Sequence, residues 1–201
     1  MFPSITLGSH NIHFSDSARN LGFILDSKLS MKKHVIKIFQ TAYFELKRIS
    51  SIRRFLSTED ATKTFVTSYI LSRLDYCNCL LMGTPNSVIQ PLQKIQNFAA
   101  RLAPRHHHST PLLEKLHWLP ISERMKYKVA CMCFSAISGS GPAYLSELLH
   151  VYTPYCTLRS SSDKRKTHGF LTFSCFGPHI WNSFPQDLRH CSTLSSFLKP
   201  N

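Results

Sequence analysis

The chain has 201 residues, of which 43% are hydrophobic and 11% aromatic. This composition excludes a wholly disordered chain and is sufficient for a buried core. Lys and Arg number 24 against 11 Asp and Glu, a formal net charge of +13, which favours a polyanionic partner. Between nucleic acid, an anionic membrane surface and a merely soluble basic protein, we expect nucleic acid.

No apolar stretch approaches the roughly 18 residues of a membrane span, and the longest candidate, Val129–Ile137, is about half that length. The N-terminal residues MFPSITLGSHN lack the basic start and long apolar segment of a signal peptide. We therefore expect a nuclear or cytoplasmic protein with no membrane partner. Its seven cysteines, an odd number, are expected to be reduced thiols.

Residues 4–26 are predicted to form three short strands. The stretches SITLG and NIHF alternate apolar and polar residues around a turn-forming group at residues 8–11. Arg19–Asp26 (RNLGFILD) alternates in the same way and is predicted as the third strand. One side of the first two strands would carry the apolar residues Ile5, Leu7, Ile12 and Phe14. Three short strands with no following sheet indicate the edge of a larger structure.

From Ser30 the apolar period changes to about 3.6 residues, which predicts a long amphipathic helix. Its buried stripe would consist of Val35, Ile38, Phe39, Ala42, Leu46 and Ile49. Its remaining faces and its C-terminal end carry Lys32, Lys33, Lys37, Lys47, Arg48, Arg53 and Arg54, with Glu45 as the only acid. Solvated helix faces usually mix both signs of charge in i,i+4 pairs. We therefore favour contact with phosphate groups over a merely solvated face.

Two further helices are predicted before residue 106. The first would begin after Ser57, with Asp60 at capping-box spacing, and run without interruption to Gly83. Pro85 would open the second, with a buried stripe of Val88, Leu92, Ile95, Phe98, Ala99 and Leu102. Its other faces carry Lys94, Arg101 and Arg105, of which the two arginines are second choices for phosphate contact. Three antiparallel helices with short connections form a small bundle.

The remaining residues are predicted to be helical with an irregular tail. Short helices are expected at residues 112–116 and 143–149, and a longer amphipathic one at 121–137. Residues 159–169 form a basic loop, and residues 170–185 are ambiguous, with a strand and a turn as our interpretation. Residues 192–201 would begin a last helix. The sequence thus predicts a mainly α fold with short N-terminal strands.

The cysteines form two Cys-x-Cys pairs, Cys77 with Cys79 and Cys131 with Cys133. On a helix such residues lie about 200° apart around the axis, so they do not easily converge on one metal or form a disulfide. Cys77 falls on the apolar stripe of its helix, which predicts a packing residue. The histidines at 106–108 have no cysteine at zinc-ligand spacing, although a zinc site with Cys131 or Cys133 is an alternative.

No catalytic pattern is recognisable in the chain. It contains no Gly-rich phosphate loop, HExxH motif or Ser-His-Asp order. Its scattered acids do not form the convergent carboxylate cluster that a two-metal polymerase or nuclease needs. We therefore predict no catalytic residue, metal or cofactor. Trp118 and Trp181 could stack on nucleic-acid bases, but an isolated Trp in an apolar run more often packs in a core.

A series of short motifs nevertheless occurs in a specific order. It consists of LGFILD and KLS, a basic helix, SRLDYCNCLL, LQKIQNFAARL, STPLLEKLHWLPISERMKYKV, PAYLSELL, TLRSSSD and TFSCFGPHIWNSFPQDLR followed by CSTLSSF. In this order the motifs resemble the C-terminal part of the reverse transcriptase polyprotein of LINE-type, non-LTR retrotransposons. The resemblance covers nearly the whole chain.

The resemblance implies three regions. Residues 1–27 would be the last strands of the polymerase palm, residues 28–105 the thumb, and residues 106–201 the post-thumb region. A thumb of this family packs against the template–primer duplex, which would account for the basic first helix. The catalytic aspartates and the endonuclease of the family would lie upstream of LGFILD, so this chain alone is not expected to be an enzyme.

Three departures from the family pattern indicate a truncated or decayed copy. The chain starts after the position of the catalytic aspartates. It is shorter than the family between TLRSSSD and KRKTHG, and it ends at SSFLKPN where the family continues through another basic helix. The leading hypothesis is a fragment of an RNA-directed DNA polymerase that binds RNA or an RNA–DNA template–primer. The alternatives are an accessory subunit that acts with a separate polymerase palm, which is the missing upstream region, and a pseudogene-like product without function.

Overall fold

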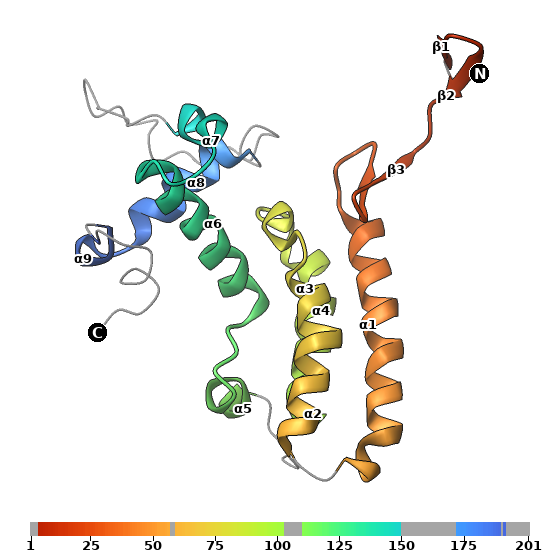
Figure 1. Ribbon diagram of the computed structural model, residues 1–201, viewed down its shortest axis with the longest axis vertical. Helices are drawn as coiled ribbons and strands as arrows, with labels where there is room; N and C mark the ends of the chain where they lie inside the picture. The colour runs from red at the N-terminus through yellow and green to blue at the C-terminus, as the bar shows by residue number, and fades with distance from the viewer. Residues whose placement is uncertain (1–3, 57–58, 103–109, 150–171, 190, 192–201) are drawn as a thin grey trace. The chain divides into compact units, whose positions relative to one another are not determined.

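The computed structural model describes residues 4–56, 59–102, 110–149, 172–189 and 191 (Figure 1). Helices make up most of these residues, and the strands are confined to the N-terminal segment, so the predicted mainly α fold is confirmed. The chain forms two compact units. The first comprises residues 1–77 with 84–118, and the second comprises residues 78–83 with 119–201.

The first unit begins with an antiparallel hairpin of β1 (Ser4–Leu7) and β2 (His10–His13). Its register places Ile5 opposite Ile12, so apolar side chains share one side, as expected from the alternation. That side is not covered within the described part of the chain. More than half of each side chain is exposed for Ile5, Leu7, Ile12 and Phe14.

A second hairpin follows, built from β3 (Ser17–Asn20) and β4 (Phe23–Asp26). The prediction of one continuous strand over Arg19–Asp26 is therefore wrong. The chain reverses at Leu21 and Gly22, where φ is 47° and 91°. Two consecutive residues with positive φ are the requirement of a tight type I′ turn. A leucine rarely adopts this conformation, which is why the alternation concealed the turn.

Helix α1 (Lys32–Ile52) continues into a short 3-10 turn, η1 (Arg53–Phe55). Its buried residues are His34, Val35, Ala42, Leu46 and Ile49. The predicted stripe is thus confirmed, except that Ile38 and Phe39 are only half-buried. The basic residues between these positions consequently lie away from the core.

The predicted second helix extends only to Asp75. It consists of α2 (Glu59–Val66), a π-helical turn η2 (Thr67–Leu71) and α3 (Ser72–Asp75), which follow one another without a gap. The 3-10 turn η3 (Asn78–Leu81) comes after it, in the second unit. Val66, Ile70 and Leu74 are completely buried. They are spaced four residues apart, and the wider π turn between them keeps such a spacing on one side. Ser57, the predicted capping residue, lies outside the described residues.

The helix ends before the Cys-x-Cys pair, contrary to the prediction. Cys77 has a φ of 51°, and a left-handed residue cannot continue a helix. Cys77 is therefore only partly buried and is not the core residue that the stripe predicted. The neighbouring Asn78 is 1% exposed instead.

Helix α4 (Asn86–Leu102) begins directly after Pro85, as predicted, and completes a three-helix bundle with α1 and the α2–α3 segment. These helices lie side by side in Figure 1. The predicted stripe of α4 is buried except for Phe98, which is 36% exposed. Helix α5 (Thr110–Lys115) packs against α4. Trp118, 8% exposed, confirms the preference for a core residue.

The second unit is organised around α6 (Ile121–Ile137), whose bounds match the prediction. It also contains α7 (Ala143–Leu148), α8 (Phe173–Ser183) and α9 (Gln186–Arg189). Helix α8 packs on α6 around a core of Val129, Ala130, Cys133, Phe134 and Ile180. The centroids of the Phe134 and Trp181 rings are 6.3 Å apart, so the half-buried Trp181 packs at the edge of this core.

The interpretation of residues 170–185 as a strand and a turn is wrong, because residues 173–183 form α8. Phe173, Phe176, Gly177 and Ile180 follow a helical spacing, and the last two are buried. Gly177 and Pro178 obscured that period, because both residues usually disfavour a helix interior. The predicted basic loop at 159–169 and the helix at 192–201 lie outside the described residues.

Candidate nucleic-acid interface

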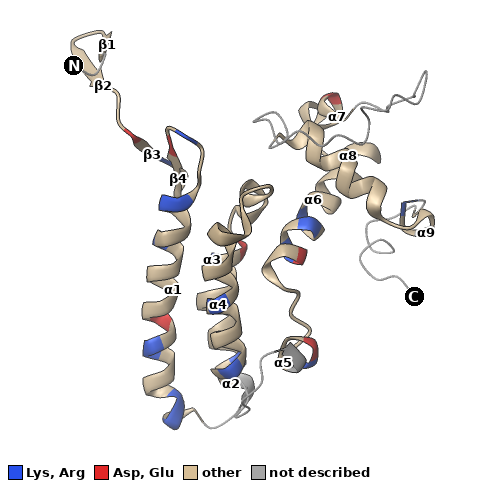
Figure 2. Cartoon of the chain, turned by 180° about the vertical axis from the view of Figure 1, so that it is seen from behind, with Lys and Arg blue, Asp and Glu red and all other residues tan. Residues whose placement is uncertain are grey.

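The predicted basic residues of the first helix lie on the surface of α1 and η1. All of them are exposed except Arg53, which is half-buried. Figure 2 shows basic residues near both ends of α1 and a single acidic segment, at Glu45, within the helix. We call the exposed residues the α1 cations: Lys32, Lys33, Lys37, Lys47, Arg48 and Arg54. Their exposure leaves them accessible to a phosphate backbone.

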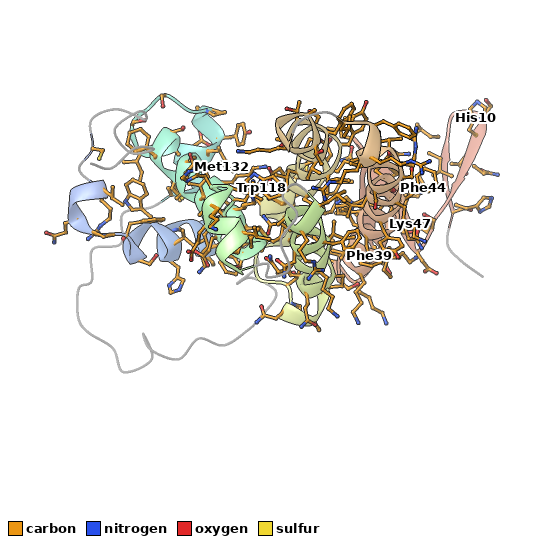
Figure 3. All side chains as sticks on the ribbon, turned by 90° about the horizontal axis from the view of Figure 1, so that it is seen from below. His10, Phe39, Phe44, Lys47, Trp118 and Met132 are labelled. Atoms are coloured by element: carbon orange, nitrogen blue, oxygen red, sulfur yellow. The ribbon has the colours of Figure 1, made fainter. Side chains whose placement is uncertain are left out.

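Aromatic rings accompany three of these cations. The Lys47 Nζ atom lies 4.9 Å from the centroid of the Tyr43 ring, and the Arg48 guanidinium lies 5.8 Å from the Phe44 ring. The Arg54 guanidinium lies 4.8 Å from the ring of Phe55, which is 73% exposed. Figure 3 shows Phe44 and Lys47 on α1. Exposed rings beside cations are the combination that stacks on bases while contacting phosphates.

Sequence reasoning missed these aromatic residues, although a signal was present. In the stretch YFELKR, Tyr43 and Lys47 are four residues apart, as are Phe44 and Arg48. Residues at this spacing meet on the surface of a helix. Tyr43 and Phe44 are 43% and 60% exposed, so a search for exposed aromatic–basic pairs would have identified both.

Glu45 reduces the charge of this surface only in part. Its carboxylate lies 3.3 Å from the Arg48 guanidinium and 3.5 Å from that of Arg73 on α3. One carboxylate shared between two guanidinium groups leaves a net positive charge. Arg48 is therefore partly compensated, whereas no ion pair to an acid is found in the described residues for Lys47 or Arg54.

Of the two arginines predicted as second choices for phosphate contact, only Arg101 lies in the described residues. Arg101 is exposed near the end of α4, and its guanidinium lies 5.8 Å from the ring centroid of Phe98. Arg105 lies outside the described residues. The pairing of Arg101 with Phe98 repeats the aromatic–basic combination of α1 on another helix of the same unit.

The two thiols of α6, those of Cys131 and Cys133, are not poised for chemistry. Burial raises the pKa of the Cys133 thiol to about 12 and also raises the pKa of Cys131. Both thiols therefore stay protonated at neutral pH, and the thiolate is the nucleophilic form. No group of three or more His, Cys, Asp or Glu side chains within the described ranges could hold a metal ion. The histidines at 106–108 lie outside those ranges.

Comparisons of the chain with protein-family models, with curated proteins and with solved structures find no match. Among the described helices, none is both long and apolar enough to cross a membrane.

Proposed function

We propose that the chain binds nucleic acid, as a fragment of a retrotransposon reverse transcriptase that lacks the catalytic aspartates. Its ligand would be RNA or an RNA–DNA template–primer, held by the α1 cations. One observation carries the proposal: exposed cations of α1 and η1 lie beside exposed aromatic rings, with one shared acid among them. The association with a reverse transcriptase rests on the order of the motifs.

The physical argument favours a phosphate backbone over general solvation. Lysines and arginines that neutralise phosphates release condensed counterions, which makes binding strong at low salt and weak at high salt. Rings such as those of Tyr43 and Phe44 add contacts to bases that do not depend on sequence. The proposal therefore predicts salt-dependent binding with little preference for sequence.

The test is fluorescence anisotropy of a labelled RNA–DNA duplex titrated with the full chain between about 50 and 200 mM salt. One triple variant removes three α1 cations: Lys32→Gln, Lys47→Gln and Arg54→Gln. The matched control removes three charges from α5 and α6: Lys115→Gln, Lys126→Gln and Lys128→Gln. If each α1 cation contacts one phosphate, the first variant lowers the slope of log K against log salt by about 2 to 3.

The control variant should change the slope much less, although it alters the net charge equally. Equal losses for the two triple variants would show that only net charge matters and would remove α1 as the interface. Affinity that does not change with salt would contradict the phosphate argument altogether.

A second candidate function is that of an accessory subunit acting with a separate polymerase palm. The observation that favours it is the β1–β2 hairpin, whose apolar side is exposed and whose two strands pair only with each other in the described residues. An open edge of this kind accepts a further strand. A primer-extension assay tests this candidate. Stimulation of a separate palm fragment would support it, and extension by the chain alone would overturn its non-catalytic assignment.

A third alternative, a product without function, predicts incomplete folding. Far-UV circular dichroism with a cooperative thermal transition would argue against it.

The proposal that the chain is a reverse transcriptase fragment includes a nuclear or cytoplasmic location, because retroelement RNA and its DNA copies are found in these compartments.

A further inference from the structure

A cleft of about 620 Å³ lies in the first unit between the β3–β4 hairpin, α1 and α3. Several contacts hold its walls together. The Tyr76 hydroxyl donates a hydrogen bond to the Leu21 carbonyl at the hairpin turn, and the Ile24 N–H donates to Nδ1 of His34 on α1 at 3.3 Å. The rings of Phe23 and His34 are 3.7 Å apart between centroids. The cleft is therefore a built feature of the fold.

The charged side chains that line the cleft are basic. It contains three cations, Arg19 from β3, Lys37 from α1 and Arg73 from α3, and hydroxyl groups from Thr41, Ser72 and Tyr76. None of the described residues that line the cleft is Asp or Glu. Its volume falls in the range of about 300–1,000 Å³ that is typical of small-molecule sites. The lining is thus suited to an anion of nucleotide size.

Two lining residues have a buried nitrogen atom that makes no hydrogen bond within the described part of the chain. One is Nε2 of His34, which is 3% exposed. Because Nδ1 of the same ring accepts the Ile24 N–H, the hydrogen of the neutral imidazole is on Nε2. Burial lowers the pKa of His34, which favours this neutral form. This lining residue therefore has a buried N–H donor for which the described residues provide no acceptor.

The other nitrogen is Nη1 of Arg73. It lies 3.5 Å from Glu45 Oε1 but makes no hydrogen bond there. Glu45 also faces Arg48 at 3.3 Å, so its single charge does not neutralise both arginines. Buried donors in folded proteins rarely lack an acceptor, and a bound ion or ligand can supply the one that the protein does not.

We infer that this cleft binds a dianionic phosphate monoester, either a free nucleotide or the phosphorylated end of a nucleic-acid strand. Three lining cations, one of them partly compensated by Glu45, come closer to the two negative charges of a monoester than to the single charge of a phosphodiester. Phosphate oxygens would supply acceptors to the lining cations and to the hydroxyl groups of Thr41 and Ser72. The cleft shares Lys37 with the α1 cations, whereas its other two cations, Arg19 and Arg73, are not among them.

The test is isothermal titration calorimetry of the full chain with adenosine 5′-monophosphate, with adenosine as the probe that lacks the phosphate. Two single variants, Arg19→Gln and Arg73→Gln, each remove one lining cation. Lys47→Gln is the matched control, because it removes a cation of α1 that is not in the cleft. The nucleotide should bind and adenosine should not, and each cleft variant should weaken binding roughly tenfold.

A second pair of probes separates the two sources of phosphate: a short RNA with a 5′-phosphate and the same RNA with a 5′-hydroxyl. Tighter binding of the 5′-phosphate RNA than of the 5′-hydroxyl RNA, with the difference lost in Arg19→Gln, indicates a strand end. Binding of the nucleotide with no difference between the two RNAs indicates a free nucleotide. The inference is overturned if neither phosphorylated probe binds, if adenosine binds as well as its monophosphate, or if Lys47→Gln has the same effect as Arg19→Gln.

The test of nucleotide binding by the cleft can fail or succeed independently of the proposed function. Absence of salt-dependent duplex binding would contradict the α1 interface, whereas nucleotide binding that depends on Arg19 would still support the cleft. Circular dichroism of Arg73→Gln checks that the loss of its contact with Glu45 has not unfolded the bundle. Arg19 is exposed on β3 and provides the variant that tests the cleft without that complication.

Discussion

Replacing Asp26 should destabilise the first unit, because its carboxylate joins β4 to the start of α1. Oδ1 accepts hydrogen bonds from the backbone N–H groups of Ser30, at 2.8 Å, and Lys28, at 3.2 Å. Oδ2 accepts a third from the Ser30 hydroxyl at 3.0 Å. Asp26 is 8% exposed, so water does not readily replace these partners. The same connection places the β3–β4 hairpin over the cleft.

The expected magnitude follows from these three bonds. A hydrogen bond to a charged group contributes about 1.5–3 kcal/mol, but bonds within one turn are not additive. We expect Asp26→Ala to lower the free energy of unfolding by about 3 kcal/mol. Asp26→Asn keeps one acceptor oxygen and loses the charge, so its loss should be about 1 kcal/mol.

The contribution of Asp26 also depends on pH. Its hydrogen bonds, that from the Ser30 N–H foremost, lower the pKa of the carboxyl below its ordinary value of 3.8. The folded chain therefore binds a proton less readily than the unfolded chain, and this stabilisation is complete above pH 3.8. It is lost as the pH falls from that value through the lower pKa of the folded state. The gap between the wild type and Asp26→Asn should close over the same interval.

Urea unfolding monitored by tryptophan fluorescence measures this effect. The chain has two tryptophans, and a Trp181→Phe background leaves Trp118 as the reporter of the first unit. Unfolding free energies for both Asp26 variants within about 0.5 kcal/mol of the wild type would refute the reasoning, since this is the usual range for surface substitutions. A gap that widened in acid would contradict the direction of the pKa shift.

Two further predictions concern the second unit. Gly177→Ala should destabilise it by about 1–3 kcal/mol, because the added Cβ would lie 3.0 Å from Cys133 Sγ and 3.1 Å from Leu149 Cδ2. Urea unfolding followed by Trp181 in a Trp118→Phe background measures the loss, and an increase in stability would mean that α8 moves away from α6 without cost. Iodoacetamide at pH 8 should alkylate the exposed Cys175 quickly and Cys133 only after unfolding, because Cys133 is buried and burial raises its pKa to about 12. Peptide mass spectrometry distinguishes the two sites, and equal rates in the folded chain would be incompatible with this packing.

The strongly periodic helices could be predicted from the sequence, and the places where the chain breaks its period could not. Helices α1, α4 and α6 have long apolar stripes, which determine both their existence and their buried faces. The positive φ values at Leu21 and Cys77 have no such signal, because neither residue type favours that conformation. Tertiary contacts impose both turns, and single-residue preferences do not reveal them.

The two candidate sites also differ in whether local sequence patterns or tertiary contacts determine them. The α1 cations lie on one helix, so their clustering follows from local spacing alone. The cleft joins Arg19, Lys37 and Arg73, which are separated by up to 54 residues and belong to different elements. Only the packing of the hairpin on α1 and α3 brings them together. Arg73 gains its proposed role, contact with a phosphate group, only from this packing.

The segment SRLDYCNCLL shows how a stretch with the composition of a reactive site can have a geometric role. Its cysteines resemble a metal or thiol site in composition, but their spacing argued against one, and Cys77 is where the helix ends and the chain passes from the first unit to the second. The residue before it, Tyr76, donates a hydrogen bond to the Leu21 carbonyl of the hairpin turn. A Cβ added at the neighbouring Gly22 would lie 3.7 Å from the Tyr76 ring. The left-handed residue at Cys77 therefore lies next to the side chain that ties the end of α3 to the hairpin, and the polar contacts of this segment with the hairpin and with Glu45 come from Tyr76 and Arg73.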